Sequence, residues 1–406
     1  MHKFYLLTLI LSCSAVSSFS QKKEEKKKWD VSNPPGTYKD IEFTTQEGTW
    51  MDLDVSPDGK TIVFDLLGDI YSLPITGGEA KSLRTGVPSE VQPRFSTDGK
   101  KISFTSDAGG GDNIWTMNTD GSQAHQITKE SFRLLNNAVW MPGDQYLIAR
   151  KHYTGTRSLG AGELWMYHIS GGEGTRLTKR KNDQQDLGEP CISPDGKYVY
   201  YSEDISPGPV FRYNKDPNGE IYAIKRYSLE SGETENVTGG NGGAVRPQLS
   251  RDGKMLAFVK RVREKSVLYV QNLSTGEAWP VYDELSKDQQ ETWAIFGVYS
   301  NFNWMPDGKS IIIWAKGKLL RIDVTGGTSQ NIPFTVHVKQ RIYDALHFEQ
   351  EVAPAQFTAK MIRQAITSPD EKTLVFNAAG FLWKKSLPAG VPERISSGTD
   401  FEYEPF

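Results

Sequence analysis

The stretch Ser193-Pro194-Asp195-Gly196-Lys197 is a tight turn, and the alternating run Tyr198-Val199-Tyr200-Tyr201 follows it directly. Proline at the second position of a turn pre-sets φ, aspartate hydrogen-bonds its local backbone, and glycine adopts the positive φ that the corner needs. A turn of this kind followed by an apolar run predicts a β-strand that begins at the turn.

The same turn recurs along the chain, which makes it the mark of a repeat. Seven copies stand at Ser56-Pro57-Asp58-Gly59, Ser96-Thr97-Asp98-Gly99, Met141-Pro142-Gly143-Asp144, Ser193-Pro194-Asp195-Gly196, Ser250-Arg251-Asp252-Gly253, Met305-Pro306-Asp307-Gly308 and Ser368-Pro369-Asp370-Glu371. Their second positions lie between 40 residues (57 to 97) and 63 residues (306 to 369) apart. The shortest spacing is that of a four-stranded propeller blade, about 40–45 residues. The sequence therefore predicts an all-β fold, a β-propeller of seven four-stranded blades over residues 36–406.

The first unit shows the strand pattern expected of every blade. Strands are predicted at Trp50–Val55, Thr61–Leu66, Asp69–Pro74 and Ala80–Leu83, with a glycine-rich turn before the last of them. The copies in the third and seventh units depart from the turn pattern at Gly143-Asp144 and at Glu371, so distortion is expected in those two blades. Thr335 to Phe348 is the one segment in which the spacing of apolar residues also allows a helix.

Both ends of the repeat region bear on closure of the ring. Asp40 to Thr45 is one β run too many for seven units, and pairing with the last blade would close the ring. At the other end, Pro405 stands where Pro93, Pro190 and Pro247 stand, three residues before the turn serine of their own units. A natural terminus is one explanation; a sequence that stops on entering an eighth unit is the one we favour.

The first residues have the pattern of an export signal. Residues 1–20 combine a short basic start, an apolar run and a small-residue cleavage site near Ser20, and they predict a signal peptide. A buried N-terminal strand is the alternative, and Cys13 also fits loosely as the anchor of a lipoprotein. The apolar run is too short for a transmembrane span. Residues 21–35 follow as a charged tether, and the expected location is periplasmic or secreted.

Composition and motifs argue against several functions. A formal net charge of −3, with no basic stripe interleaved with aromatic residues beyond residue 30, argues against a nucleic-acid footprint. The six histidines contain no His-x-His pair and no His-Glu-x-x-His; they are His2, His125, His152, His168, His337 and His347. Neither Gly-x-Ser-x-Gly nor a complete phosphate loop occurs. We therefore expect no catalytic residues, no metal ligands and no cofactor in this chain.

Binding is the remaining expectation, because the inner strands of a propeller converge on a central channel. The predicted channel-facing residues are Arg94, Arg246, Arg363, Trp50, Trp140, Trp304 and Glu189. Arginines in such a channel bind a carboxylate or an acidic peptide through charge-assisted hydrogen bonds. The alternative is structural: the tryptophans pack between blades, and the arginines pair with neighbouring acids.

The repeated turn, together with endings such as Arg176-Leu177-Thr178, resembles the repeats of TolB-type propellers over about residues 36–406. Longer phrases at 213–219, 332–338 and 350–354 look like the N-terminal propeller half of large secreted bacterial amidohydrolases. This resemblance implies a non-catalytic domain of an exported hydrolase acting on C–N bonds, with a metal ion in a hydrolase domain that follows in the same polypeptide. A stand-alone TolB-like module that binds an envelope protein or peptide is the alternative.

Overall fold

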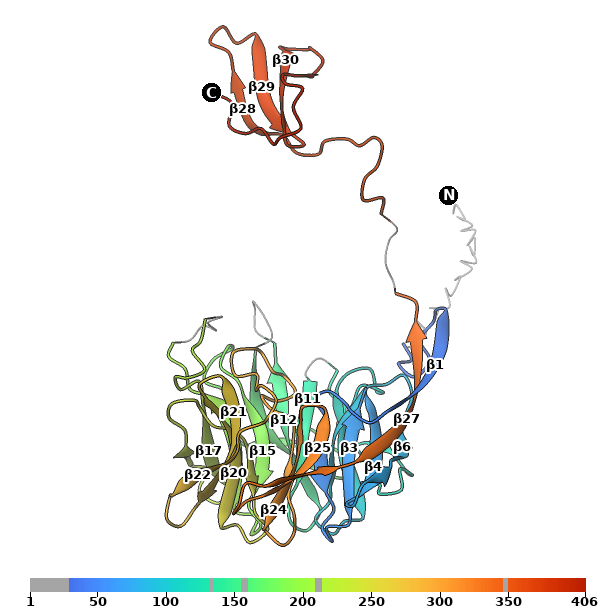
Figure 1. Ribbon diagram of the computed structural model, residues 1–406, viewed down its shortest axis with the longest axis vertical. Helices are drawn as coiled ribbons and strands as arrows, with labels where there is room; N and C mark the ends of the chain where they lie inside the picture. Colours follow the sequence, from blue (N-terminus) through green and yellow to red (C-terminus); the bar gives the residue numbers. More distant parts are fainter. Residues whose placement is uncertain (1–28, 132–133, 155–159, 209–213, 346–349) are drawn as a thin grey trace, which may run out of the picture. The chain divides into compact units, whose positions relative to one another are not determined.

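The structure is a computed structural model that describes residues 29–131, 134–154, 160–208, 214–345 and 350–406. The predicted signal peptide lies outside these residues, as does most of the tether. The regular structure of the described residues consists of β-strands (Figure 1). None of these residues forms a helix that is long and apolar enough to span a bilayer.

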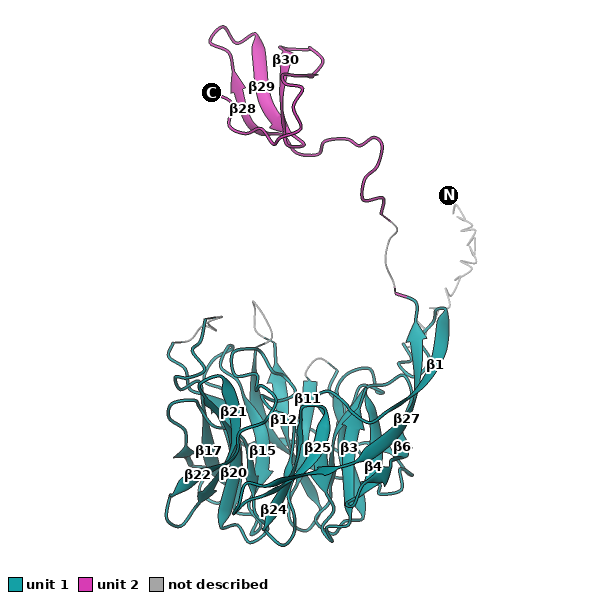
Figure 2. Cartoon of the chain, viewed as in Figure 1, with its two compact units in different colours: residues 1–344 teal, residues 345–406 magenta. Residues whose placement is uncertain are grey.

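The chain divides into two compact units, residues 1–344 (unit 1) and residues 345–406 (unit 2), coloured separately in Figure 2. The predicted all-β propeller architecture with seven four-stranded sheets is confirmed. Six of these sheets belong to unit 1, and the seventh forms unit 2.

Each sheet is a meander in which neighbouring strands of the sequence pair antiparallel. The first and second sheets are β2 (Leu53–Val55), β3 (Thr61–Leu66), β4 (Asp69–Pro74), β6 (Lys81–Arg84), and β7 (Glu90–Phe95), β8 (Lys101–Ser106), β9 (Asn113–Asn118), β10 (His125–Gln126). The third and fourth are β11 (Leu134–Trp140), β12 (Tyr146–Tyr153), β13 (Ala161–His168), β14 (Thr175–Arg176), and β15 (Leu187–Ile192), β16 (Tyr198–Asp204), β17 (Tyr222–Ser228), β18 (Thr234–Thr238).

The remaining three sheets follow the same plan. The fifth and sixth are β19 (Val245–Leu249), β20 (Met255–Val262), β21 (Lys265–Asn272), β22 (Ala278–Tyr282), and β23 (Asn303–Trp304), β24 (Ser310–Ala315), β25 (Lys318–Asp323), β26 (Ser329–Ile332). The seventh is β28 (Arg363–Thr367), β29 (Thr373–Ala378), β30 (Phe381–Ser386), β31 (Glu393–Arg394). The third and seventh sheets are complete in spite of their altered turns.

The six sheets of unit 1 form a closed ring. Their inner strands contact one another in the order β2, β7, β11, β15, β19, β23, and β23 contacts β2 again. Hydrogen bonds span this last junction: the amide of Leu53 donates to the carbonyl of Asn301 at 3.2 Å, and the amide of Asn301 donates to the Asp52 carboxylate at 2.5 Å. The ring of unit 1 is therefore complete with six blades.

The repeated turn is held by its own side chains. In the fourth sheet the Ser193 hydroxyl donates to the Asp195 carboxylate at 2.6 Å and accepts from the amide of Tyr198 at 2.9 Å. Gly196 has a φ of 71°, which glycine adopts without a steric penalty. In the third and seventh sheets this position is taken by Asp144 (φ 57°) and Glu371 (φ 58°), so the altered turns keep the backbone conformation without glycine.

The extra N-terminal run forms β1 (Tyr38–Thr45), which pairs antiparallel with β27 (Phe334–Tyr343) along its whole length. The expectation that this run pairs with the last blade was wrong. β27 pairs in parallel with β5 (Gly78–Glu79) through Phe334 and Thr335, and the rest of β27 pairs with β1. The segment after Thr335 that also allowed a helix is thus a strand as far as Tyr343.

The burial of Asp69, the first residue of β4, leads to a prediction about pH. Its carboxylate accepts hydrogen bonds from the Gly86 amide (3.2 Å) and from Gln340 of β27 (2.8 Å), and burial raises the pKa of Asp69 to about 6. Since the unfolded-state pKa is about 3.9, the folded state binds this proton more tightly. The stability that Asp69 contributes is therefore fully present below about pH 4, and it is lost as the pH rises through 6.

We expect the Asp69→Asn variant, which stays neutral, to gain stability relative to the parent between pH 4 and pH 7, measured by urea unfolding at several pH values. Asp58→Asn is the matched control, for which the change in stability with pH is expected to have the opposite sign. Its carboxylate is exposed, and hydrogen bonds from the Ser56 hydroxyl and the Lys60 amide lower the pKa of Asp58. A stability difference for Asp69→Asn that stays constant over this pH range would contradict the assignment.

Candidate functional site

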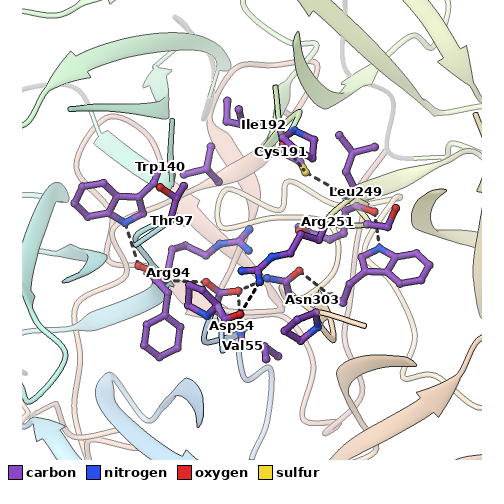
Figure 3. Close-up of a pocket in the computed structure, with 18 of the residues that line it drawn as sticks. Asp54, Val55, Arg94, Thr97, Trp140, Cys191, Ile192, Leu249, Arg251 and Asn303 are labelled. Carbon is purple, nitrogen blue, oxygen red and sulfur yellow. Dashed lines mark hydrogen bonds between the residues drawn. The ribbon is translucent and has the colours of Figure 1, made fainter. Parts of the chain in front are cut away.

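A funnel opens where the inner strands of unit 1 end at their turns. The cavity has a volume of about 550 Å³ and is lined by residues of all six sheets (Figure 3). Such a site follows from the ring itself, because six equivalent strand ends converge on one axis.

The wall of the funnel is apolar. The residue just before each turn contributes one side chain, and these six are Val55, Phe95, Trp140, Ile192, Leu249 and Trp304. The indole N–H of Trp140 donates to the carbonyl of Arg94 at 3.1 Å, and that of Trp304 donates to the carbonyl of Gln248 at 2.9 Å. Both tryptophans therefore bridge neighbouring blades and also present ring surface to the cavity.

Asp54 lies on the floor of the funnel, and its hydrogen-bonding capacity is taken by the protein. Its carboxylate accepts from the amides of Val55 (2.9 Å) and Phe95 (2.8 Å) and from the side chain of Asn303 (2.5 Å). Burial raises the pKa of Asp54, and the nearby Arg94 opposes this shift.

Arg94 is the other charged residue of the floor, and only 7% of it is exposed. Among the described residues its guanidinium makes no hydrogen bond or ion pair, although Asp54 is close enough to interact with it electrostatically. Burial lowers the pKa of Arg94, but a guanidinium stays charged at any physiological pH. Its N–H donors therefore remain available in the funnel to an acceptor from outside the protein.

Arg251 places a second guanidinium at the mouth of the funnel. It is exposed, and it donates to the carbonyl of Pro57 at 2.6 Å. Figure 3 shows Arg94 and Arg251 extending from different sides toward the same part of the cavity, close to Asp54. The funnel thus combines an apolar wall with two cations at different depths.

Cys191 also lines the floor, as a free thiol. Its sulfur accepts from the amide of Leu249 at 3.4 Å, and burial raises the pKa of Cys191 to about 11. The thiolate is the nucleophilic form of cysteine, so this residue is suited to packing and not to covalent chemistry.

A ring of polar residues lies one layer below the floor. It is formed by the residue four positions before each turn, and its members are Asp52, Gln92, Asn137, Glu189, Arg246 and Asn301, all buried. Four of them (Gln92, Asn137, Glu189 and Arg246) have positive φ values between 53° and 58°. The sequence analysis selected Arg246 and Glu189 but did not recognise them as parts of one layer, although a signal for it was present: a polar residue recurs four positions before the turn of every unit.

The ring binds residues 294–299, which we call the plug segment. The carbonyl of Phe296 accepts from Gln92 (2.6 Å), Asn137 (3.3 Å) and Arg246 (3.3 Å). The amide of Val298 donates to Glu189 at 2.6 Å. The plug segment therefore contacts four sheets below the floor, and it makes the funnel a blind cavity.

Arg246 is the centre of this polar layer and is fully buried. Its guanidinium donates to the carbonyl of Tyr299 (2.7 Å) and to the side chain of Asn137 (2.9 Å). Its nitrogens lie 3.4 Å from Glu189 and 3.9 Å from Asp52. Groups of the protein therefore satisfy the hydrogen-bond donors of Arg246. This matches the alternative in which the arginine has a structural role and does not bind a ligand.

The predicted channel residues separate into three groups. Arg94, Trp140 and Trp304 line the funnel, whereas Arg246 and Glu189 bind the plug segment beneath it. Trp50 does not line the funnel; its ring packs against Tyr299 (5.8 Å between centroids) and Trp314 (6.0 Å). Arg363 is an exposed residue of unit 2. Arg363 was misplaced because sequence spacing does not show which repeats share a ring. Trp50 belongs to unit 1 but stands six residues before its turn, whereas the predicted residues that line the funnel stand one or two residues before theirs.

Across the described ranges, no group of three or more histidine, cysteine, aspartate or glutamate side chains is arranged to hold a metal ion. The geometry of the funnel is that of a binding site, with a cation, an acid that is already hydrogen-bonded, and apolar walls.

Comparison with known proteins agrees with this architecture. Residues 42–213 match the family model described as the TolB beta propeller domain. The crystal structure of TolB from Acinetobacter baumannii superposes with a TM-score of 0.53 at 16% identity, covering 71% of this chain and 65% of that one, which shows the fold alone. Residues 42–213 are therefore similar to the TolB beta propeller domain, and the propeller fold of the chain is shared with TolB.

Two curated relatives are peptidases by name. The uncharacterized peptidase YuxL of Bacillus subtilis is 31% identical over 157 residues, which cover 37% of this chain and 21% of that protein. Dipeptidyl-peptidase 5 of Porphyromonas endodontalis is 22% identical over 269 residues, which cover 52% of this chain and 36% of that protein. This chain thus spans only part of the length of each relative.

Proposed function

We propose that the funnel of unit 1 binds the carboxylate of a peptide, with Arg94 as the group that receives it. The observation that carries this proposal is the buried guanidinium of Arg94, whose hydrogen-bond donors have no acceptor among the described residues. A carboxylate matches the planar fork of an arginine and forms two parallel charge-assisted hydrogen bonds with it. Arg251 at the mouth favours the approach of an anion.

The apolar wall determines which ligand side chain is preferred next to the carboxylate. Trp140, Trp304 and Phe95 offer ring surfaces around the floor, so an aromatic or aliphatic side chain next to the carboxylate would be buried with it. We therefore propose a peptide C-terminus that ends in an apolar residue as the preferred ligand.

We propose that this propeller is the non-catalytic binding domain of an exported hydrolase that acts on C–N bonds. The resemblance to secreted amidohydrolases supports a metal-dependent hydrolase domain later in the same polypeptide, and the peptidase relatives support a peptide substrate. The signal peptide predicted for residues 1–20 supports a periplasmic or secreted location, with lipid attachment at Cys13 as a minor alternative. A stand-alone module that binds an envelope protein or peptide is the second candidate, which the TolB-type propeller favours.

The binding proposal is tested by isothermal titration calorimetry with two N-acetylated tripeptides. Both have two alanines and a C-terminal phenylalanine; one ends in a free carboxylate and the other in an amide. A hydrogen bond to a charged group contributes about 1.5–3 kcal/mol. We therefore expect the free-acid peptide to bind about 10–100 times more tightly than the amide peptide. Equal affinities would overturn the proposal.

A further inference from the structure

Unit 2 has the local structure of a single propeller blade. Its turn is held as in unit 1, with the Ser368 hydroxyl donating to the Asp370 carboxylate at 2.7 Å. Its inner strand β28 has a bulge between Arg363 and Ile366, and Gln364 has a φ of 52°. These are the features of the inner strands β7, β11, β15 and β19 in unit 1.

The last six residues of the chain repeat the way one blade of unit 1 leads into the next. The amide of Glu402 donates to the carbonyl of Gly380 at 2.9 Å, as the amide of Glu90 donates to the carbonyl of Gly68 at 2.7 Å. Two residues later, Glu404 has a φ of 51°, where Gln92 has 58°. Pro405 then takes the place of Pro93.

A second hydrogen bond identifies this segment as the start of another inner strand. The amide of Glu404 donates to the side-chain oxygen of Gln364 at 3.0 Å. Unit 1 has the same contact between successive blades, where the amide of Asn137 donates to Gln92 at 2.9 Å and the amide of Arg246 donates to Glu189 at 2.6 Å. Residues 401–406 therefore dock on the seventh sheet as the next blade would.

The inner strand of unit 2 is uncovered, in contrast to those of unit 1. Ile366 is 43% exposed, whereas Val139 and Cys191 at the equivalent position of unit 1 are each 8% exposed. All five residues of β28 are exposed. One repeat cannot bury both faces of its sheet, so it needs neighbouring repeats on either side. The ring of unit 1 is already closed by its own six sheets.

We propose that unit 2 is the first blade of a second propeller, and that its uncovered faces are occupied by further blades of the same repeat. Residues 401–406 begin the second blade of that ring, and the chain that follows residue 406 in the natural protein supplies the rest. This inference does not depend on the ligand of the funnel or on the proposed hydrolase.

The natural reading frame gives the first test. The turn of the next blade is expected to begin two residues after Phe406, at position 408, with serine or methionine there, aspartate at 410 and glycine at 411. Further turns of the same kind are expected at spacings like those between 57 and 369. A stop codon directly after residue 406, or a continuation without these turns, would overturn the inference.

Hydrogen exchange gives the second test, with the chain ending at residue 406 compared with the natural chain that includes the following repeats. We expect the amides of β28 to exchange at least about tenfold more slowly in the longer chain, while those of β2 and β3 in unit 1 exchange equally in both. Equal exchange of β28 in the two chains would overturn the inference. So would protection of β28 that rises with the concentration of the shorter chain, because a second copy would then be the occupant.

Discussion

Replacement of Arg246 by methionine is expected to lower the free energy of unfolding of unit 1 by about 3–5 kcal/mol. Methionine has a similar length but no charge, so the carboxylates of Glu189 and Asp52 would lose the cation that lies within 4 Å of them. The carbonyls of Tyr299 and Phe296 would lose a donor as well, which loosens the plug segment. Urea unfolding monitored by tryptophan fluorescence measures the loss.

Arg251→Met is the matched control for this prediction. Arg251 carries the same side chain at the mouth of the same ring, but it is exposed, and exposed substitutions usually change stability by about 0.5 kcal/mol or less. Similar losses of unfolding free energy for the two variants, or a loss below 1 kcal/mol for Arg246→Met, would show that the buried polar layer does not stabilise the ring of unit 1 as we describe.

Replacement of Arg94 by glutamine is expected to weaken binding of the free-acid peptide by about 10–100-fold. Glutamine keeps a hydrogen-bond donor but removes the charge and the forked geometry. Stability should change little, because the guanidinium has no hydrogen-bond acceptor in the protein, and the desolvation cost that its removal relieves offsets the lost attraction to Asp54. Calorimetric titration and thermal unfolding measure the two effects.

The amide peptide serves as the control for Arg94→Gln, since it presents the same apolar side chain without the carboxylate. Its affinity should change little in the variant. An equal loss of affinity for both peptides would mean that Arg94 shapes the funnel and does not receive the carboxylate.

The repeat could be predicted from the sequence because its determinants are local. The turn at Ser193 is fixed by two side-chain hydrogen bonds and one glycine within six residues, and these residue types can be recognised in the sequence. The predicted strands Thr61–Leu66 and Asp69–Pro74 coincide with β3 and β4 for the same reason.

Closure of the ring could not be predicted, since it depends on contacts between distant parts of the chain. Asn301 hydrogen-bonds Asp52 and Leu53 across the junction of the sixth and first sheets, and no spacing in the sequence identifies that pair. The pairing of β1 with β27 is of the same long-range kind. Seven copies of the same turn therefore predicted a single ring of seven blades, whereas contacts between distant strands close the ring of unit 1 after six sheets.

The candidate site was predictable in part. The inner-strand rule located Arg94, Trp140 and Trp304, because these positions follow from the turn alone. It also selected Arg246, which differs from Arg94 by two positions within the repeat and so belongs to the layer below. The plug segment, which comes from the connection between the fifth and sixth sheets, contacts Arg246 together with Asn137 and Glu189, and these long-range contacts distinguish Arg246 from Arg94.

A crystal structure of the protein with the free-acid peptide tests the central claim most directly. We expect the peptide carboxylate within hydrogen-bond distance of the Arg94 guanidinium, with the phenylalanine ring against the apolar wall between Trp140 and Trp304. A peptide bound elsewhere on the molecule, or one whose carboxylate contacts only Arg251 at the mouth, would contradict it.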